Sequence, residues 1–262
     1  MNDIYYDMIF KRKSFHIFKE TQSLTKDDIG EIEHQIKQLI PLVKEIDVVF
    51  RVVPKQETTC KRGEYCILIY SEIKDHYLQN VGYLGEQLDL WLASKNIGGC
   101  WYGVGNPDES RYNGLDFVIM LAIAKTDKKT FRKDYTKSKR KPLNEIWNGL
   151  QYQEIASVIR YAPSACNTQP WYIECKDNKL SLYRVKGKRG IMPKNKVVYY
   201  NRIDIGIMMF FLEVCLIHEK YDFSRELFLD FLQDETRNLI AKYSISISCI
   251  ILRVFSNTNG KR

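Results

Sequence analysis

The chain has 262 residues, of which 45% are hydrophobic and 27% are charged, as in ordinary globular proteins with one large or two small domains. This composition excludes a disordered chain, a collagen and a long coiled coil. The formal net charge is +8, and the excess is concentrated in basic runs at 125–141 and 184–196. Such runs suit an anionic partner, either nucleic acid or a phosphorylated cofactor, but they are also usual on solvated faces.

We expect neither a membrane span nor an export signal. The longest apolar run, 205–212, is far shorter than the ~20 residues that a span needs, and the acidic amino terminus has no apolar stretch of the signal-peptide kind. The seven cysteines are an odd number without a CxxC pair, which predicts free thiols, no metal site and a cytoplasmic location. They stand at positions 60, 66, 100, 166, 175, 215 and 249.

The first half of the chain predicts helices and strands in alternation. Thr25 and Asp28 form a capping box at the start of a helix over 26–39, where isoleucines recur at helical spacing. A longer apolar-faced helix covers 81–92 and stops at the glycines of 96–99. Runs of β-branched and apolar residues predict strands at 47–53, 65–70 and 117–124.

The second half predicts similar elements. After Pro142 a helical pattern runs through Ile146 to Ile159, and Pro163 breaks it. Two short strands flank Asp177-Asn178, which is typical of a hairpin turn. The predicted strands lie at 171–175, 180–185 and 244–255, and a further helix lies at 204–217.

A comparison of the two halves suggests an internal duplication. Shifting the sequence by 124 residues places Gly82 on Gly206 and Asp89 on Glu213. Each half would then contribute one central helix. Because any two amphipathic helices can be aligned in part, chance agreement is the alternative at this point.

The segment that begins at Arg12 has the chemistry of a phosphate site. Arg12, Lys13 and Ser14 put two cations beside a hydroxyl, and His16 follows two residues later. Charge-assisted donors of this kind suit a phosphate dianion. The alternative is a short solvated basic patch.

The segment APSACNTQPW at 162–171 combines small residues with carboxamides between two prolines. Such a loop presents backbone N–H groups and amide side chains at fixed positions, which suits a planar heterocycle with polar edges. The alternative is an ordinary connection between a helix and a strand.

The segment NIGGCW at 96–101 carries paired glycines, Gly98 and Gly99. Glycines allow a ligand to approach the backbone closely. The alternative is a simple helix end.

Together these segments resemble the FMN-dependent nitroreductase family. RKSFHIF at 12–18 is similar to its Arg-Arg-Ser-x-Arg-x-Phe motif, and APSACNTQPW is similar to its Ala-Pro-Ser-x-x-Asn-x-Gln-Pro-Trp motif. NIGGCWYG at 96–103 resembles its Gly-Leu-Gly-x-Cys-Trp-x-Gly segment, and RKPLNEI at 140–146 resembles its closing basic stretch. The long separation of the first two motifs resembles a fused branch in which one chain mimics the usual homodimer.

The resemblance implies an α+β fold with two related α/β halves, each a sheet flanked by helices, packed as a pseudo-dimer. The first half would span 1–148 and carry the phosphate-binding and glycine motifs. The second half would span 149–262 and carry the Ala-Pro-Ser loop. One composite cofactor site would lie between them, and a monomer would suffice to build it.

The resemblance also implies roles for individual residues. The group that would face the phosphate and ribityl chain of FMN is Arg12, Lys13, Ser14, His16 and Arg140. The group that would pack on or bind the isoalloxazine ring is Pro163, Ser164, Ala165 and Asn167, while Gly98 and Gly99 would approach its N5 edge. Lys13 and His16 replace arginines of the motif, which weakens bidentate phosphate binding.

The function implied is an NAD(P)H oxidoreductase that reduces a small-molecule electron acceptor, nitroaromatic or quinone-like, by ping-pong hydride transfer through flavin N5. The cofactor carries the chemistry, so no protein nucleophile or base is required. Two alternatives are a flavin-binding protein without reductase activity and a basic nucleic-acid-binding protein. The latter has the charge but lacks aromatic residues interleaved with the basic runs.

Overall fold

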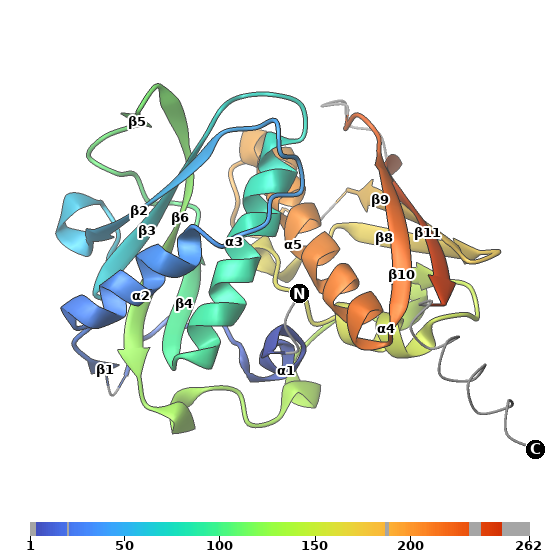
Figure 1. Ribbon diagram of the computed structural model, residues 1–262, viewed down its shortest axis with the longest axis horizontal. Helices are drawn as coiled ribbons and strands as arrows, with labels where there is room; N and C mark the ends of the chain where they lie inside the picture. The colour runs from blue at the N-terminus through green and yellow to red at the C-terminus, as the bar shows by residue number, and fades with distance from the viewer. Residues whose placement is uncertain (1–3, 20, 187–188, 231–236, 248–262) are drawn as a thin grey trace, which may run out of the picture.

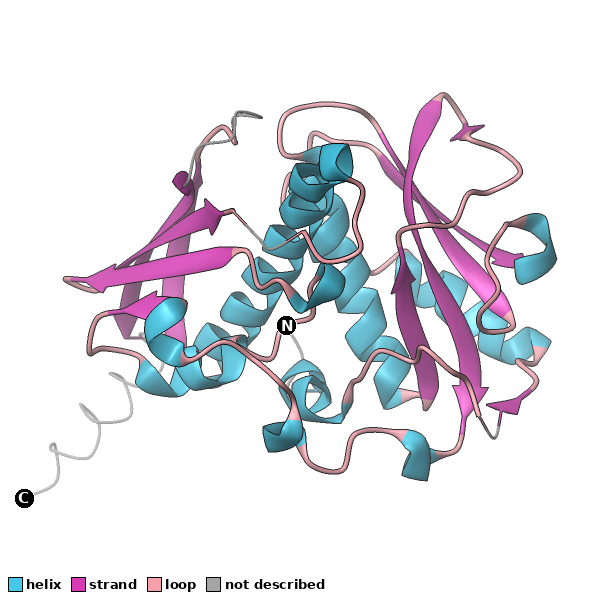
Figure 2. Cartoon of the chain, turned by 180° about the vertical axis from the view of Figure 1, so that it is seen from behind, coloured by secondary structure: helices cyan, strands magenta, loops and turns pink. Residues whose placement is uncertain are grey.

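Two sheets lie on either side of a central pair of long helices (Figure 1). The computed structural model describes residues 4–19, 21–186, 189–230 and 237–247. The view from behind shows the same arrangement, with a sheet at each side and helices between them (Figure 2). This is the fold predicted from the sequence: two α/β halves, each with its own sheet flanked by helices.

The first half contributes a six-stranded sheet. Its central strand, β6, pairs antiparallel with β3 along one edge and with β4 along the other, and β2 pairs with the outer edge of β3. The elements of this half are α1 (Ile4–Lys11), β1 (Thr21–Gln22), α2 (Lys26–Ile36), β2 (Val48–Pro54), β3 (Tyr65–Ser71), α3 (Tyr77–Ser94), β4 (Ile97–Tyr102), β5 (Arg111–Tyr112) and β6 (Leu115–Thr126).

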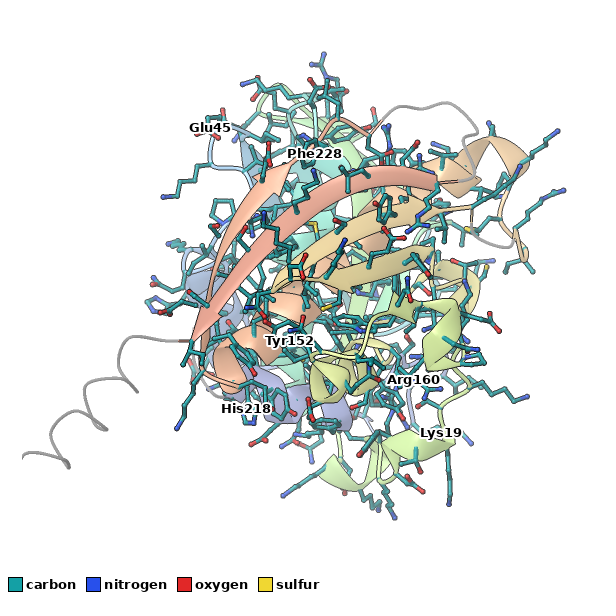
Figure 3. The ribbon with its side chains drawn as sticks, turned by 90° about the vertical axis from the view of Figure 1, so that its right-hand side faces the viewer. Lys19, Glu45, Tyr152, Arg160, His218 and Phe228 are labelled. Atoms are coloured by element: carbon teal, nitrogen blue, oxygen red, sulfur yellow. The ribbon has the colours of Figure 1, made fainter. Side chains whose placement is uncertain are left out.

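The second half contributes a five-stranded sheet in the order β10-β11-β9-β8-β7. All its pairs are antiparallel except the short one between β7 and β8. Figure 3 shows this sheet from its outer side. The elements are β7 (Trp147–Asn148), α4 (Gln153–Ile159), β8 (Trp171–Lys176), β9 (Lys179–Val185), α5 (Val197–His218), β10 (Tyr221–Leu227) and β11 (Arg237–Ile247).

The two halves repeat one topology. Apart from the two-residue strands, the order α2-β2-β3-α3-β4-β6 recurs as α4-β8-β9-α5-β10-β11. The pairing recurs as well, because β2-β3-β6-β4 in one sheet corresponds to β8-β9-β11-β10 in the other. The internal relation suggested by the sequence is therefore present in the order and pairing of the elements.

The central helices α3 and α5 cross at two glycines that the 124-residue shift had aligned. A Cβ on Gly82 would lie 2.0 Å from the carbonyl oxygen of Ile203, and a Cβ on Gly206 would lie 1.9 Å from that of Gln79. The second pair repeats the first, since Gln79 and Ile203 are also 124 residues apart. Only glycine permits this distance between the helix backbones at the crossing.

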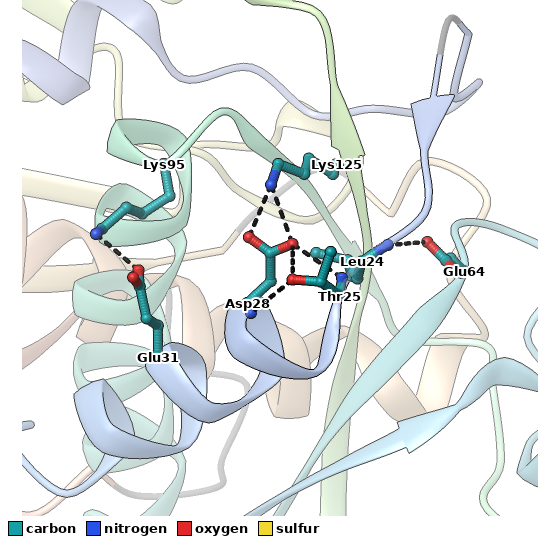
Figure 4. Close-up of polar contacts among 7 residues, drawn as sticks. All are labelled: Leu24, Thr25, Asp28, Glu31, Glu64, Lys95 and Lys125. Atoms are coloured by element: carbon teal, nitrogen blue, oxygen red, sulfur yellow. Dashed lines mark hydrogen bonds and ion pairs between the residues drawn. The ribbon is translucent and has the colours of Figure 1, made fainter.

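Helix α2 is fixed at its start by the predicted capping box. The Thr25 hydroxyl accepts from the Asp28 backbone N–H, and the Asp28 carboxylate accepts from the Thr25 backbone N–H (Figure 4). Lys125 on β6 donates to both Asp28 carboxylate oxygens at 2.8 and 3.0 Å, which ties the helix to the sheet. The helix ends at Ile36, three residues before the predicted end at 39.

The continuous helix predicted after Pro142 is wrong. Residues 143–145 form a single 3₁₀ turn, and Trp147 then pairs with Ile173 at the edge of the second sheet. Gly149 follows with φ of +127°, a conformation that interrupts any helix. Only Gln153–Ile159 is helical.

Two elements of the second half are present with boundaries that differ from the predicted ones. The helix predicted at 204–217 begins earlier, at Val197. The closing strand predicted at 244–255 begins at Arg237, and its part beyond 247 lies outside the described residues. The prediction omitted β10, although its apolar and polar residues alternate.

The described residues form neither a membrane-spanning helix nor a metal site. None of their helices is long and apolar enough to cross a membrane, and no group of three or more His, Cys, Asp and Glu side chains among them could hold a metal ion. Six of the seven cysteines lie in this part of the chain, all as free thiols. The division at 148/149 stays a prediction. It separates β7 from the second sheet, in which β7 pairs with β8.

Candidate functional site

A cavity of about 440 Å³ lies where the two halves meet. From the first half it takes the segment after α1 and two arginines of the basic run, and from the second half it takes the loop at 163–167 and one face of α5. Its lining residues are Arg12, Lys13, Ser14, His16, Trp101, Ile119, Arg132, Arg140, Pro163, Ser164, Ala165, Cys166, Asn167, Tyr200, Ile203, Asp204 and Ile207.

Nine of the eleven cofactor-binding residues predicted from the sequence line this one cavity. The nine are Arg12, Lys13, Ser14, His16, Arg140, Pro163, Ser164, Ala165 and Asn167. They come from segments up to about 150 residues apart in the chain. The basic run at 125–141 also contributes Arg132, which had not been singled out.

The other two predicted residues, Gly98 and Gly99, are not among the residues that line the cavity. The Gly99 carbonyl accepts from the Phe15 backbone N–H at 3.0 Å. A Cβ on Gly99 would lie 2.2 Å from Oδ1 of Asp89, and one on Gly98 would lie 2.7 Å from the Phe15 ring. The glycines therefore let the segment that follows α1 pack onto β4, and so they position Arg12 and its neighbours.

Arg12 forms a buried ion pair. Its Nε donates to Oδ2 of Asp89 at 2.7 Å, and both side chains are almost fully buried. Glu86 lies 3.9 Å from the same nitrogen, and burial raises the pKa of its carboxyl well above the ordinary value. Asp89 thus balances the charge of Arg12.

Three other cations around the cavity, Lys13, Arg132 and Arg140, have no carboxylate within ion-pair distance in the described part of the chain. Burial, and then neighbouring arginines, lowers the pKa of Arg132 and of Arg140 to about 10. Burial and then Arg132 likewise lower the pKa of Lys13. With pKa values of about 10, Arg132 and Arg140 remain charged at pH 7, so this end of the cavity favours an anion.

His16 adds no charge to this cluster. Burial and then Arg62 and Arg12 lower its pKa below the ordinary value, which leaves the imidazole neutral at pH 7. The Arg62 guanidinium donates to His16 Nδ1 at 2.9 Å. His16 can therefore offer a neutral polar edge to a ligand.

The Ala-Pro-Ser loop is held in an unusual conformation by its own polar groups. Cys166, Asn167 and Gln169 all have φ between +45° and +55°, where non-glycine residues are uncommon. The Ser164 hydroxyl accepts from the Gln169 backbone N–H at 2.9 Å. This geometry turns the backbone of 163–167 towards the cavity.

The same loop is bound to the end of the first half. Asn167 accepts from Arg140 and donates from Nδ2 to the Lys139 carbonyl at 2.9 Å. Gln169 Oε1 accepts from the Lys141 backbone N–H at 2.7 Å. We call this set, 139–141 with Asn167 and Gln169, the latch. Asn167, which was expected to bind the cofactor ring, thus joins the two halves in this structure.

The sequence prediction omitted the face of α5 and the floor of the cavity. Tyr200, Ile203, Asp204 and Ile207 recur at helical spacing on α5, and Trp101 and Ile119 complete an apolar wall. Apolar residues on a central helix look like ordinary core. The signal available in the sequence was Asp204, a carboxylate just before the apolar run at 205–212.

The arrangement combines a cationic end with an apolar wall. Phosphate or carboxylate groups suit the first, and a flat ring system suits the second, as in cofactor sites generally. The lining contains no serine–histidine–aspartate arrangement and no pair of neighbouring carboxylates. It can bind and orient a reactive ligand, but these residues do not form an acid–base pair of their own.

A family model and two solved structures show which proteins this chain resembles. The family model described as "Putative TM nitroreductase" matches residues 4–215. A crystal structure described as a "putative nitroreductase" from Thermotoga maritima is similar with a TM-score of 0.58 and 18% identity, over 93% of this chain and 94% of that one. A nitroreductase family protein from Clostridium novyi NT aligns with 51% of this chain and 89% of its own, at 18% identity and a TM-score of 0.39. A search of curated proteins found no match.

The family match covers most of the chain, including every residue that lines the cavity. The structural match shows the fold over nearly the full length of both chains. The chain therefore belongs to this nitroreductase family and is an oxidoreductase.

Proposed function

We propose that the protein is an FMN-dependent NAD(P)H oxidoreductase that reduces nitroaromatic or quinone-like acceptors in the cavity between its halves. The observation that carries this proposal is the cluster of Lys13, Arg132 and Arg140, which have no carboxylate partner among the described residues and lie beside the apolar wall of α5. FMN has the matching form, because it joins a phosphate dianion to a planar heterocycle.

The residues present fit such a cofactor. Arg140 Nε is buried and has no hydrogen-bond partner among the residues that the structure describes, which normally costs free energy unless a ligand or water meets the group. Arg132 and Lys13 would share the phosphate with Arg140. Pro163, Ile203 and Ile207 would border the ring, and the backbone of Ser164 and Ala165 would meet its polar edge.

Hydride transfer at N5, from NAD(P)H to the acceptor, is the chemistry that FMN supplies when bound. The residues of the chain bind the cofactor and orient it. The cations hold the phosphate end, and the apolar residues Trp101, Ile119 and Ile203 exclude water from the ring. A cavity of about 440 Å³ leaves little room for donor and acceptor together, so they would bind in turn.

The test starts from the purified protein titrated with FMN. We expect the flavin absorption bands to stay with the protein through gel filtration and NADPH or NADH oxidation to accelerate when a quinone or nitroaromatic is added. Double-reciprocal plots with both substrates varied should give parallel lines, the pattern of a ping-pong route. Failure to bind FMN at micromolar concentration, about −8 kcal/mol, would refute the cofactor. Binding without turnover would leave a flavin-binding protein that is not a reductase.

A further inference from the structure

Asp204 lines the cavity and has a buried carboxyl oxygen whose partner is not a described residue. The residue lies on α5 and is 3% exposed. Its Oδ1 accepts from the Ala165 backbone N–H at 2.9 Å, which fixes the Ala-Pro-Ser loop to the helix. Its Oδ2 is buried and accepts or donates no hydrogen bond within the described part of the chain. The related Asn80 also has a buried side-chain atom without a partner, Nδ2, but only Asp204 lines this cavity.

The related position in the first half shows that anchoring the loop does not require an acid. The 124-residue shift places Asn80 on Asp204, and Asn80 Oδ1 accepts from the Val43 backbone N–H at 3.1 Å. An amide thus performs the same structural task on α3. Asn80 does not line the cavity between the halves. Anchoring the loop to the helix therefore does not require a carboxyl at position 204.

Asp204 is a hydrogen-bond donor at neutral pH. Burial raises its pKa to about 8, and the bond from Ala165 only partly offsets burial. The ionisable groups that share the cavity with it are Arg12, Lys13, His16, Arg132, Arg140, Cys166 and Tyr200. Among the described residues none of the cations lies within ion-pair distance of Asp204. A neutral carboxyl donates through one oxygen while the other still accepts.

We propose that Asp204 binds the flavin ring directly, with Oδ2 donating a hydrogen bond to an acceptor atom on the edge of the heterocycle. This inference rests on the proposed function. It makes Asp204 a ligand-binding residue in addition to an anchor of the loop, and it links ring binding to the protonation of a single carboxyl. Above pH 8 the ionised carboxylate would repel the same acceptor atom.

The decisive variant is Asp204→Asn, which keeps Oδ1 for Ala165 and places a donor that does not titrate at the position of Oδ2. We would measure dissociation constants by quenching of flavin fluorescence from pH 7 to 9.5, with FMN and with riboflavin as separate probes. The wild type should lose affinity at least tenfold across this range relative to Asp204→Asn, and the two should agree within about threefold at pH 7. Riboflavin should show the same ratio, because it has the ring but no phosphate.

A second variant, Asp204→Leu, tests the donor itself. It should bind both flavins at least tenfold more weakly at pH 7, with circular dichroism and the urea midpoint of each variant confirming the fold. Wild-type and Asp204→Asn profiles that coincide at every pH would overturn the proposal, as would a ratio that appears with FMN alone. Failure of the wild type to bind either flavin would instead refute the proposed function.

Discussion

Arg12 and Arg132 line the same cavity in opposite electrostatic situations. Arg12 is paired with Asp89 at 2.7 Å, both side chains being buried, whereas the described part of the chain provides no carboxylate within ion-pair distance of Arg132. A paired cation attracts an anion weakly, because its charge is already balanced. Within the motif that first suggested a phosphate site, Lys13 is thus the cation left for the ligand, and Arg12 serves the framework.

We predict that Arg132→Gln weakens FMN binding by ten- to a hundredfold, since a hydrogen bond to a charged group contributes about 1.5–3 kcal/mol. Fluorescence titration gives the dissociation constant. Lys133→Gln is the matched control, because Lys133 is exposed and outside the cavity lining. Equal affinity in the two variants would contradict a phosphate role for Arg132.

We predict that Arg12→Met mainly destabilises the fold. It leaves Asp89 as a buried charge without its partner, which costs about 3–5 kcal/mol. Urea unfolding measures this loss. The double variant Arg12→Met/Asp89→Asn should recover more than half of it, because both substituted side chains are neutral. No recovery would show that Arg12 stabilises through packing alone.

Single elements show which local signals in the sequence carry structural information. The capping box of α2 was predicted from Thr25 and Asp28 because its bonds join residues three apart. The helix through Ile146 was predicted wrongly, since its apolar spacing reflects burial at the edge of the second sheet. The latch and the Arg12–Asp89 pair join residues 28 and 77 positions apart, and nothing local in the sequence specifies such partners.

The Asp28 carboxylate makes the anchoring of α2 dependent on pH. Burial acts to raise its pKa, but hydrogen bonds from Lys125 and Thr25 outweigh burial and hold it below the ordinary value. A carboxyl whose pKa is lower in the folded than in the unfolded protein stabilises the fold at any pH above its unfolded-state pKa. That stabilisation is lost as the pH falls through the folded-state pKa. We predict that the free energy of unfolding falls less below pH 4 in Asp28→Asn than in the wild type. Urea midpoints from pH 6 to 2.5 test this, and identical slopes would contradict it.

Replacing glycine by alanine should have opposite effects at the α3–α5 crossing and on the exposed helix α2. Gly206→Ala puts a methyl group against the Gln79 carbonyl oxygen and should destabilise by about 1–3 kcal/mol. Gly30→Ala, on α2, meets nothing within 4 Å and should stabilise by about 1 kcal/mol, because alanine favours helix. Thermal unfolding compares the two. A neutral Gly206→Ala would mean that the helices can separate at no cost.

In the whole molecule, the two related halves form cavities that differ in their lining residues. His76 and Gln79, related by the 124-residue shift to Tyr200 and Ile203, line a different cavity of about 880 Å³. Its charged residues are of both signs, with Lys74 and Arg202 against Glu45, Asp75 and Asp230. A cluster of one sign, as in the FMN candidate site, is absent from that lining.

We therefore predict one FMN per chain, bound by a monomer. Flavin released by heat and quantified against protein should give a ratio of one. Sedimentation velocity on diluted samples should show flavin absorbance moving with the monomer. A ratio of two, or flavin lost whenever an oligomer dissociates, would be incompatible with a composite site built within one chain.

The unequal cavities have a genetic consequence. In a symmetric homodimer every codon is expressed on both sides of the two-fold axis, so each substitution alters both sites at once. In this chain the residues that flank the α3–α5 crossing are encoded separately, Gln79 on one side and Ile203 on the other. A substitution here changes one cavity and leaves its counterpart untouched, so natural selection can act on each independently.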